Sequence, residues 1–170
     1  MVIDKLYTLD KYEQKIVELC ANQRQNNKIK TGWDGHKTVN EKSDIDLNVV
    51  GFGGEFLFAR ENNLFPDFKI HNTSKQLKTD QYDLSWMGKS VDVKVNRNKN
   101  NPFMIPVYAK TSCDIFVLFS CQYPKYVFEG FMLGSIIFNK KNIRMTRVDA
   151  YVLEKKNLLS YEQLIFLLNL

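Results

Sequence analysis

The sequence predicts a mixed α/β (α+β) fold with a central mixed β-sheet flanked by helices, and three stretches support this class. Residues 10–25 carry apolar side chains at helical spacing, residues 91–96 alternate strictly between apolar and polar side chains, and residues 115–119 form a short run of branched and aromatic side chains. These patterns are typical of a helix, a half-buried strand and a central buried strand, respectively. Helices and strands are therefore both expected to build the core.

A chain of 170 residues fits one domain, which we expect to span residues 1–170. A hydrophobic content of 44% is a globular value, so we expect an ordered chain. No apolar run approaches the roughly 20 residues that span a bilayer, and no signal peptide is recognised. We therefore expect a cytoplasmic protein without membrane contact. The net charge of +5 suits a polyanionic partner such as nucleic acid.

Few cysteines and histidines limit the possible chemistry. Cys20, Cys113 and Cys121 are odd in number and lack CxxC spacing, which favours free thiols in a reducing compartment. His36 and His71 are too few for a zinc motif or a histidine-centred triad. The sequence therefore argues against zinc and Ser/His chemistry.

The first helix is expected over residues 10–25. Asp10 is the predicted N-cap, and Glu13, three residues on, is its capping-box partner. We expect this helix to pack on the sheet and to carry no chemistry. The apolar stripe that would make the contact consists of Tyr12, Ile16, Leu19 and Cys20.

Residues 26–44 are polar and predict a long loop. The loop contains Lys30, Trp33 and Lys37, and a basic loop with one tryptophan could contact a nucleic-acid backbone or stack on a base. The simpler alternative is an exposed loop held in place by a buried Trp33.

A second helix is expected over residues 44–62. Gly51, Gly53 and Gly54 lie in its interior, where each is about 1 kcal/mol less favourable than alanine. A helix with such residues is expected to bring its backbone close to another element. Glu55 follows the glycines and would reach the acidic residues of the next hairpin if the helix packs on it. Otherwise Glu55 would be an exposed helix charge. Residues 64–80 form a connector.

Residues 82–96 predict a β-hairpin with Met87–Gly88 as its two-residue loop. This loop sets a register in which Asp83 stands opposite Asp92, with Cβ atoms about 5 Å apart. Two carboxylates at that distance repel by roughly 3 kcal/mol at an effective dielectric near 20. Lys94 on the same face would relieve part of this repulsion, and Mg²⁺ or Mn²⁺ would relieve more. The alternative is a solvated strand face with an Asp83–Lys94 ion pair.

Later segments complete the expected sheet. Residues 103–108 predict a short extended piece, and residues 114–121 a central buried strand. Residues 126–138 predict a strand pair or one long bent strand, in which Gly130 and Gly134 mark bulges or bends.

The C-terminal part, residues 143–170, is expected to hold a strand over residues 148–153 and a closing helix capped by Ser160. A basic turn and strand precede them and would form a solvated edge or contact phosphates. Their basic residues are Lys140, Lys141, Arg144 and Arg147.

The order of the acidic residues resembles that of the PD-(D/E)XK nuclease superfamily, the restriction-endonuclease-like fold. Its small phage-type members carry a Gly-x-x-Gly-Glu signature on the first core helix, which residues 51–55 match. Asp83 follows, and Asp92-Val93-Lys94 matches the family's D-x-K tripeptide. The resemblance spans roughly residues 45–138. Tyr82 stands where the family has a proline before the first aspartate.

This resemblance implies a Mg²⁺-dependent DNA endonuclease, in which Mn²⁺ could replace Mg²⁺. Asp83 would bridge the metal or metals, and Asp92 and the backbone carbonyl of Val93 would be ligands. Glu55 would ligate a metal or hold a metal-bound water. Lys94 would orient or activate the attacking water and stabilise the charge on phosphorus. Contacts to the phosphates would come from Lys89, Asn96, Arg97 and Lys110, together with the basic loops.

The chemistry supports this interpretation without the family, because phosphodiester hydrolysis needs a nucleophile at neutral pH, an in-line geometry and relief of charge at phosphorus. Clustered carboxylates, one lysine and a divalent cation provide all three. The expected partner is duplex or branched DNA, and the chain could act as a homodimer. The alternatives are a catalytically inactive nucleic-acid-binding domain of the same fold, a nuclease that acts on RNA, and an exonuclease.

Overall fold

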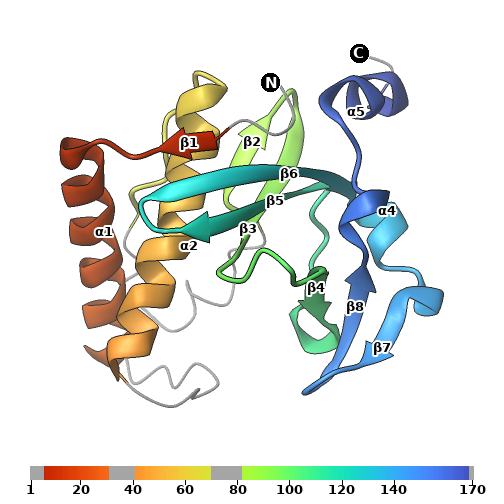
Figure 1. Cartoon of the computed structure of the whole chain (residues 1–170), viewed down its shortest axis with the longest axis horizontal. Helices are drawn as coiled ribbons and strands as arrows, with labels where there is room; N and C mark the ends of the chain where they lie inside the picture. The colour runs from red at the N-terminus through yellow and green to blue at the C-terminus, as the bar shows by residue number, and fades with distance from the viewer. Residues whose placement is uncertain (1–5, 31–40, 70–81, 169–170) are drawn as a thin grey trace.

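The structure is a computed structural model that describes residues 6–30, 41–69 and 82–168 (Figure 1). It contains a five-stranded and a three-stranded sheet. The order of the larger sheet is β1 (Leu6–Thr8), β6 (Lys125–Leu133), β5 (Ile115–Gln122), β3 (Lys89–Asn96) and β2 (Leu84–Trp86). The smaller sheet has the order β4 (Phe103–Pro106), β8 (Asp149–Leu153) and β7 (Ile143–Met145).

The larger sheet is mixed, because β3 and β5 run parallel while its other neighbouring strands are antiparallel. Helices pack with this sheet, so the predicted mixed α+β class is confirmed. The short turns of 3₁₀ helix are η1 (Val107–Ala109), η2 (Lys140–Asn142) and η3 (Lys155–Asn157).

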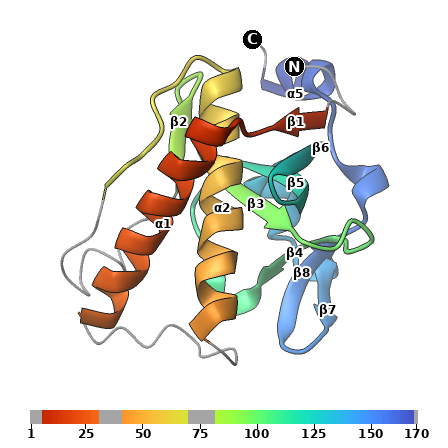
Figure 2. The same cartoon turned by 60° about the vertical axis from the view of Figure 1, so that its left-hand side comes forward.

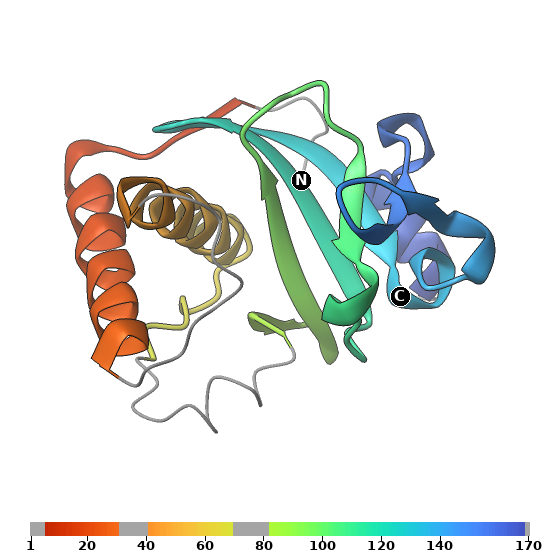
Figure 3. The ribbon, with the colours of Figure 1, turned by 90° about the horizontal axis from the view of Figure 1, so that it is seen from below.

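Two long helices cover one face of the larger sheet, with α2 (Glu41–Glu61) against the strands and α1 (Lys11–Lys30) outside it (Figures 2 and 3). The smaller sheet and α4 (Gly134–Ile137) lie on the opposite side (Figure 3). Alternating residues of β5 divide the core accordingly. Ile115 and Val117 pack with α2, whereas Phe116 and Leu118 pack with the smaller sheet.

The start of α1 is as predicted, and its end is not. The Asp10 N–H donates to Glu13 Oε2 at 2.8 Å, and the Glu13 N–H donates to Asp10 Oδ1 at 2.9 Å, which is the expected capping box. The helix continues to Lys30, and α2 already begins at Glu41. Residues 26–30 and 41–44 are therefore helical rather than loop. Trp33 and Lys37 lie outside the described residues.

The predicted apolar stripe of α1 is wrong for three of its four residues, and only Cys20 packs against the core. Tyr12, Ile16 and Leu19 are 77%, 41% and 59% exposed, whereas Val17 and Ala21 are fully buried. The main partner of α1 is α2 rather than the sheet. Small side chains at positions 17 and 21 allow the two helices to pack closely, and α2 covers the sheet in the place expected for α1.

Two of the three glycines in α2 lie at close contacts, as their cost in a helix suggests. A Cβ atom on Gly54 would lie 2.5 Å from Val95 Cγ2 on β3. A Cβ atom on Gly53 would overlap the hydroxyl of buried Tyr126, which donates to the Val50 carbonyl at 3.0 Å. Gly51 has open space, with nothing within 4 Å of such an atom.

The later strands match the predictions in part. Gly130 has φ 143° and lies at a register shift between β5 and β6, so the predicted bulge is confirmed. Gly134 instead begins α4, because β6 ends at Leu133. The piece at 103–108 is β4 followed by η1, and β8 confirms the strand near 148–153.

The closing helix is α5 (Tyr161–Leu168), and the Ser160 hydroxyl accepts the Gln163 N–H at 3.2 Å, as expected for its cap. Cys20, Cys113 and Cys121 are free thiols. Among the described residues, no helix combines the length and apolar character needed to cross a membrane.

Substituting alanine at two glycines of α2 should have opposite effects. Gly53→Ala should lower the free energy of unfolding by about 1–3 kcal/mol, because its methyl group overlaps the hydroxyl of Tyr126. Gly51→Ala, the matched control, should raise this free energy by up to about 1 kcal/mol, because alanine favours a helix and meets no neighbour. Urea unfolding followed by circular dichroism measures both. Equal stabilisation by the two substitutions would contradict the close packing at Gly53.

Candidate metal and active site

The hairpin that carries the acidic residues has the predicted register. Met87 and Gly88 form its loop with φ 52° and 72°, and Ser85 pairs with Ser90. Trp86 is 5% exposed, and its ring stacks on that of Phe131 with centroids 5.7 Å apart. Trp86 also packs against Phe58 of α2, so this packing fixes the edge strand β2 with its apolar side chains toward α2.

Asp83 immediately precedes β2, at the point where the pairing between β2 and β3 stops although β3 continues. Its N–H donates to the Val91 carbonyl at 2.9 Å, and its Oδ2 accepts the Val93 N–H at 2.7 Å. The aspartate side chain therefore takes the place of the next strand residue in the ladder. Beyond this point β2 supplies no further pairing to β3.

Asp92 and Lys94 lie on one face of β3, two residues apart. Lys94 Nζ is 2.6 Å from Asp92 Oδ1, and Asp92 is 6% exposed. Val91 and Val93 belong to the core that includes α2, so alternation places Asp92 and Lys94 on the opposite face. The direct ion pair of Lys94 is therefore with Asp92, and not with Asp83 as the alternative of a solvated strand face predicts.

Glu55 reaches the site from α2, whose backbone lies close to β3 at Gly54. Its Oε2 is 3.1 Å from Nη1 of Arg24 on α1, for which the sequence predicts no role in the site. Arg24 also donates to the Asp67 carbonyl at 2.5 Å and lies over the Phe52 ring at 4.5 Å. The first helix, which was expected to carry no chemistry, thus provides an ion-pair partner for Glu55.

Arg24 could have been found only with the buried face of α1 in hand. It lies seven residues after Val17 and three after Ala21, which places it on the same helix face as these buried residues. A basic residue on a buried face needs an acidic or carbonyl partner. The exposed stripe chosen from the sequence concealed this signal.

Electrostatic effects show that the acids share one environment. Burial raises the pKa of Asp83 well above its usual range, and the charges of Glu55 and Asp92 raise it further. Burial also raises the pKa of Glu55, with a smaller rise from Asp92, while Arg24 lowers it. Burial lowers the pKa of Lys94, but Asp92, Asp83 and Glu55 raise it by more. Lys94 is consequently held as an ammonium ion.

The residues expected to contact nucleic acid lie at different places. Lys89 and Lys110 line one pocket. Asn96 donates its amide to the carbonyls of Asn101 and Pro102 and so holds the following loop. Arg97 is exposed just beyond β3, and Lys30 is exposed at the end of α1.

The donor set suits a hard divalent cation, because three carboxylates and the Val93 carbonyl offer oxygen ligands. As the side chains stand, no three His, Cys, Asp or Glu residues within 6–30, 41–69 and 82–168 form a group that could hold a metal ion. Asp92 and Glu55 face Lys94 and Arg24 instead. Metal binding would require these two carboxylates to turn toward the ion.

Comparison of the chain with known protein families, with curated proteins and with solved structures found no match. The class of the protein is therefore defined by its fold and site alone. It is a mixed α+β protein with a carboxylate–lysine cluster at a strand edge.

Replacing Asp83 by asparagine should stabilise the protein at neutral and alkaline pH. Asparagine can still accept the Val93 N–H but removes the charge that burial and two acids disfavour. Because the pKa of Asp83 is higher in the folded chain, its carboxylate reduces stability progressively as the pH rises above about 4. Each unit of pKa shift corresponds to roughly 1.4 kcal/mol, and each kcal/mol to about 2–4 °C in melting temperature.

The melting temperature of Asp83→Asn should thus exceed that of the wild type at pH 8 in EDTA, and the gain should vanish toward pH 4. Asp114→Asn is the matched control, because hydrogen bonds from Ser90 lower the pKa of Asp114. Loss of the Asp114 charge in this variant should not raise the melting temperature. A gain for Asp83→Asn that is independent of pH would contradict the electrostatic explanation.

Proposed function

We propose that the chain is a metal-dependent DNA endonuclease with a restriction-endonuclease-like core. The observation that carries the proposal is that Glu55, Asp83 and Asp92 lie within electrostatic reach of one another or of Lys94, where the pairing between β2 and β3 stops. Two of these acids have raised pKa values because they are buried near other acids. A purely structural cluster would gain stability from apolar side chains instead, so this arrangement favours a site that binds a cation.

The acids would hold the cation together with the Val93 carbonyl. This carbonyl faces the same strand edge as the Val93 N–H, because both groups of one strand residue point to the same side. When bound, Mg²⁺, or Mn²⁺ in its place, supplies a water of lowered pKa and offsets charge that develops on the phosphate. Asp83 and Asp92 would be its nearest ligands, and Glu55 would ligate it or hold a water.

Lys94 would act through its ammonium group. Three acids keep its proton in place, so it would donate hydrogen bonds to the attacking water and to phosphate oxygens. Arg24 would hold Glu55 in position through the 3.1 Å ion pair. The basic residues Lys89, Lys110 and Arg97 would contact the DNA backbone. We propose that the protein acts in the cytoplasm, which would be that of the host if the protein is viral. A homodimer would allow cleavage of both DNA strands.

A catalytically inactive nucleic-acid-binding domain of the same fold is the second candidate. The observation that favours it is that Lys94 and Arg24 already neutralise two of the three acids. Activity on RNA and exonuclease action use the same groups, and the choice of substrate separates them from the main proposal.

The wild-type protein should nick or linearise plasmid DNA with Mg²⁺ and should not do so with EDTA. Asp92→Ala should abolish cleavage, and Lys94→Met should reduce its rate by about 100–1,000-fold, the loss typical of a donor to a developing charge. Asp149→Ala, the matched control, removes an exposed acid of β8 and should cleave like the wild type. Gel electrophoresis of plasmid, nicked, branched and single-stranded DNA and of RNA provides the measurement.

Metal binding has a separate readout in thermal unfolding. Mg²⁺ should raise the melting temperature of the wild type and of Asp149→Ala but not that of Asp92→Ala, because a ligand of the folded state stabilises it. Stabilisation without cleavage of any substrate would favour the inactive candidate. Cleavage that persists in Asp92→Ala would overturn the site.

A further inference from the structure

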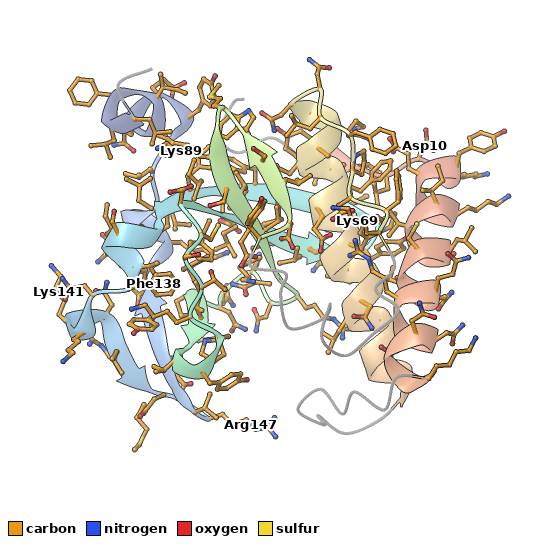
Figure 4. The ribbon with its side chains drawn as sticks, turned by 180° about the vertical axis from the view of Figure 1, so that it is seen from behind. Asp10, Lys69, Lys89, Phe138, Lys141 and Arg147 are labelled. Carbon is orange, nitrogen blue, oxygen red and sulfur yellow. The ribbon has the colours of Figure 1, made fainter. Side chains whose placement is uncertain are left out.

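A pocket of about 550 Å³ lies at the end of the larger sheet where β3 and β5 begin and β6 ends. Lys89, Lys110 and α4 contribute to its walls, and Leu168 of α5 also lines it. Figure 4 shows Lys89 beside α5 and Phe138 next to α4 on the same side of the molecule. The volume falls in the range of small-molecule sites, about 300–1,000 Å³.

The lining combines two kinds of chemistry. Lys89 and Lys110 provide ammonium groups, and Thr111 and Ser135 provide hydroxyl groups. Asp114 provides one carboxylate, which accepts the N–H and the hydroxyl of Ser90. Leu133, Phe138 and Leu168 provide apolar surface, and Lys110 Nζ lies 5.4 Å from the centroid of the Phe138 ring. The two ammonium groups outnumber the single carboxylate, so a ligand with an anionic group and a flat apolar group, such as a nucleotide, suits this lining.

One wall of the pocket adjoins the acidic cluster. Cys113 lines the pocket, and its thiol donates to the Ser90 carbonyl at 3.2 Å, two residues before Asp92. Burial raises the pKa of Cys113 to about 11, with smaller contributions from Asp92 and Asp83. The thiol is therefore a neutral wall between the two sites rather than a nucleophile.

The spacing along β3 relates the pocket to the cleavage point. Lys89 and Asp92 are three residues apart, which corresponds to about 10 Å at the rise of a strand. A nucleotide in the pocket would therefore lie a short way along the substrate strand from a phosphate held at Asp92.

We propose that this pocket binds one unpaired nucleotide of the substrate strand, with its phosphate on Lys89 and Lys110 and its base against Phe138 and Leu168. The inference rests on the proposed nuclease function and adds a substrate class to it. A base enters such a pocket only when it is out of the duplex. The preferred substrate therefore has a single-stranded, frayed or branched segment close to the cleaved bond.

The test is fluorescence anisotropy of a labelled single-stranded oligothymidylate and of a duplex of equal length, with EDTA and at fixed salt. Ser135→Leu fills the pocket from an exposed position and leaves the charge unchanged. It should weaken oligothymidylate binding about tenfold, the lower range for loss of one stacked base. Lys110→Ala should weaken it similarly, and Ser135→Leu should leave duplex affinity unchanged.

Arg147→Ala is the charge control, because Arg147 is exposed and lies far from Lys89 in Figure 4. It should weaken binding of the oligothymidylate less than Lys110→Ala does. Wild-type affinity in Ser135→Leu, or equal losses in Lys110→Ala and Arg147→Ala, would overturn the pocket. Plasmid cleavage separates the two proposals. Weakened binding in the pocket variants of a protein that cleaves nothing supports the pocket alone, and cleavage with unchanged oligothymidylate binding supports the nuclease alone.

Discussion

The hydrogen bond from the Val93 N–H to the Asp83 carboxylate, 2.7 Å long, is the interaction on which the arrangement of the site depends. It stands where the ladder between β2 and β3 would otherwise continue. Because β2 has three residues and β3 has eight, β2 pairs with only part of β3, and beyond Asp83 no described strand pairs with this edge of β3. The same bond places the Asp83 charge beside Asp92, so the geometry of the strand edge and the electrostatics of the acids have one origin.

The approach of α2 to the sheet is the second constraint. Gly54 permits contact with Val95, and Gly53 leaves room for the buried Tyr126 hydroxyl. With larger side chains at these positions the helix would lie farther from β3, and Glu55 would move away from Asp92 and Asp83. The glycines therefore lower the intrinsic stability of the helix and bring the third acid within electrostatic reach of the other two.

Features set by neighbouring residues could be predicted from the sequence, and features set by distant packing could not. The hairpin register follows from Met87 and Gly88, and the capping box from Asp10 and Glu13. The buried face of α1 depends on α2 instead, and periodicity alone selected the exposed stripe. The bond from Arg24 to Glu55 joins residues that are 31 positions apart, so no local pattern indicates it. The pocket is likewise formed by several separate segments.

The charges of the site explain why its acids differ. Lys94 and Arg24 bring two positive charges to three carboxylates, which leaves one negative charge in excess. Lys94 bonds Asp92 and Arg24 bonds Glu55, whereas the Asp83 carboxylate accepts a neutral backbone N–H. Burial and the charges of Glu55 and Asp92 accordingly raise the pKa of Asp83 well above its usual range. A divalent cation beside Asp83 would reverse this imbalance, and the resulting positive charge is what a phosphodiester at the edge of β3 would meet.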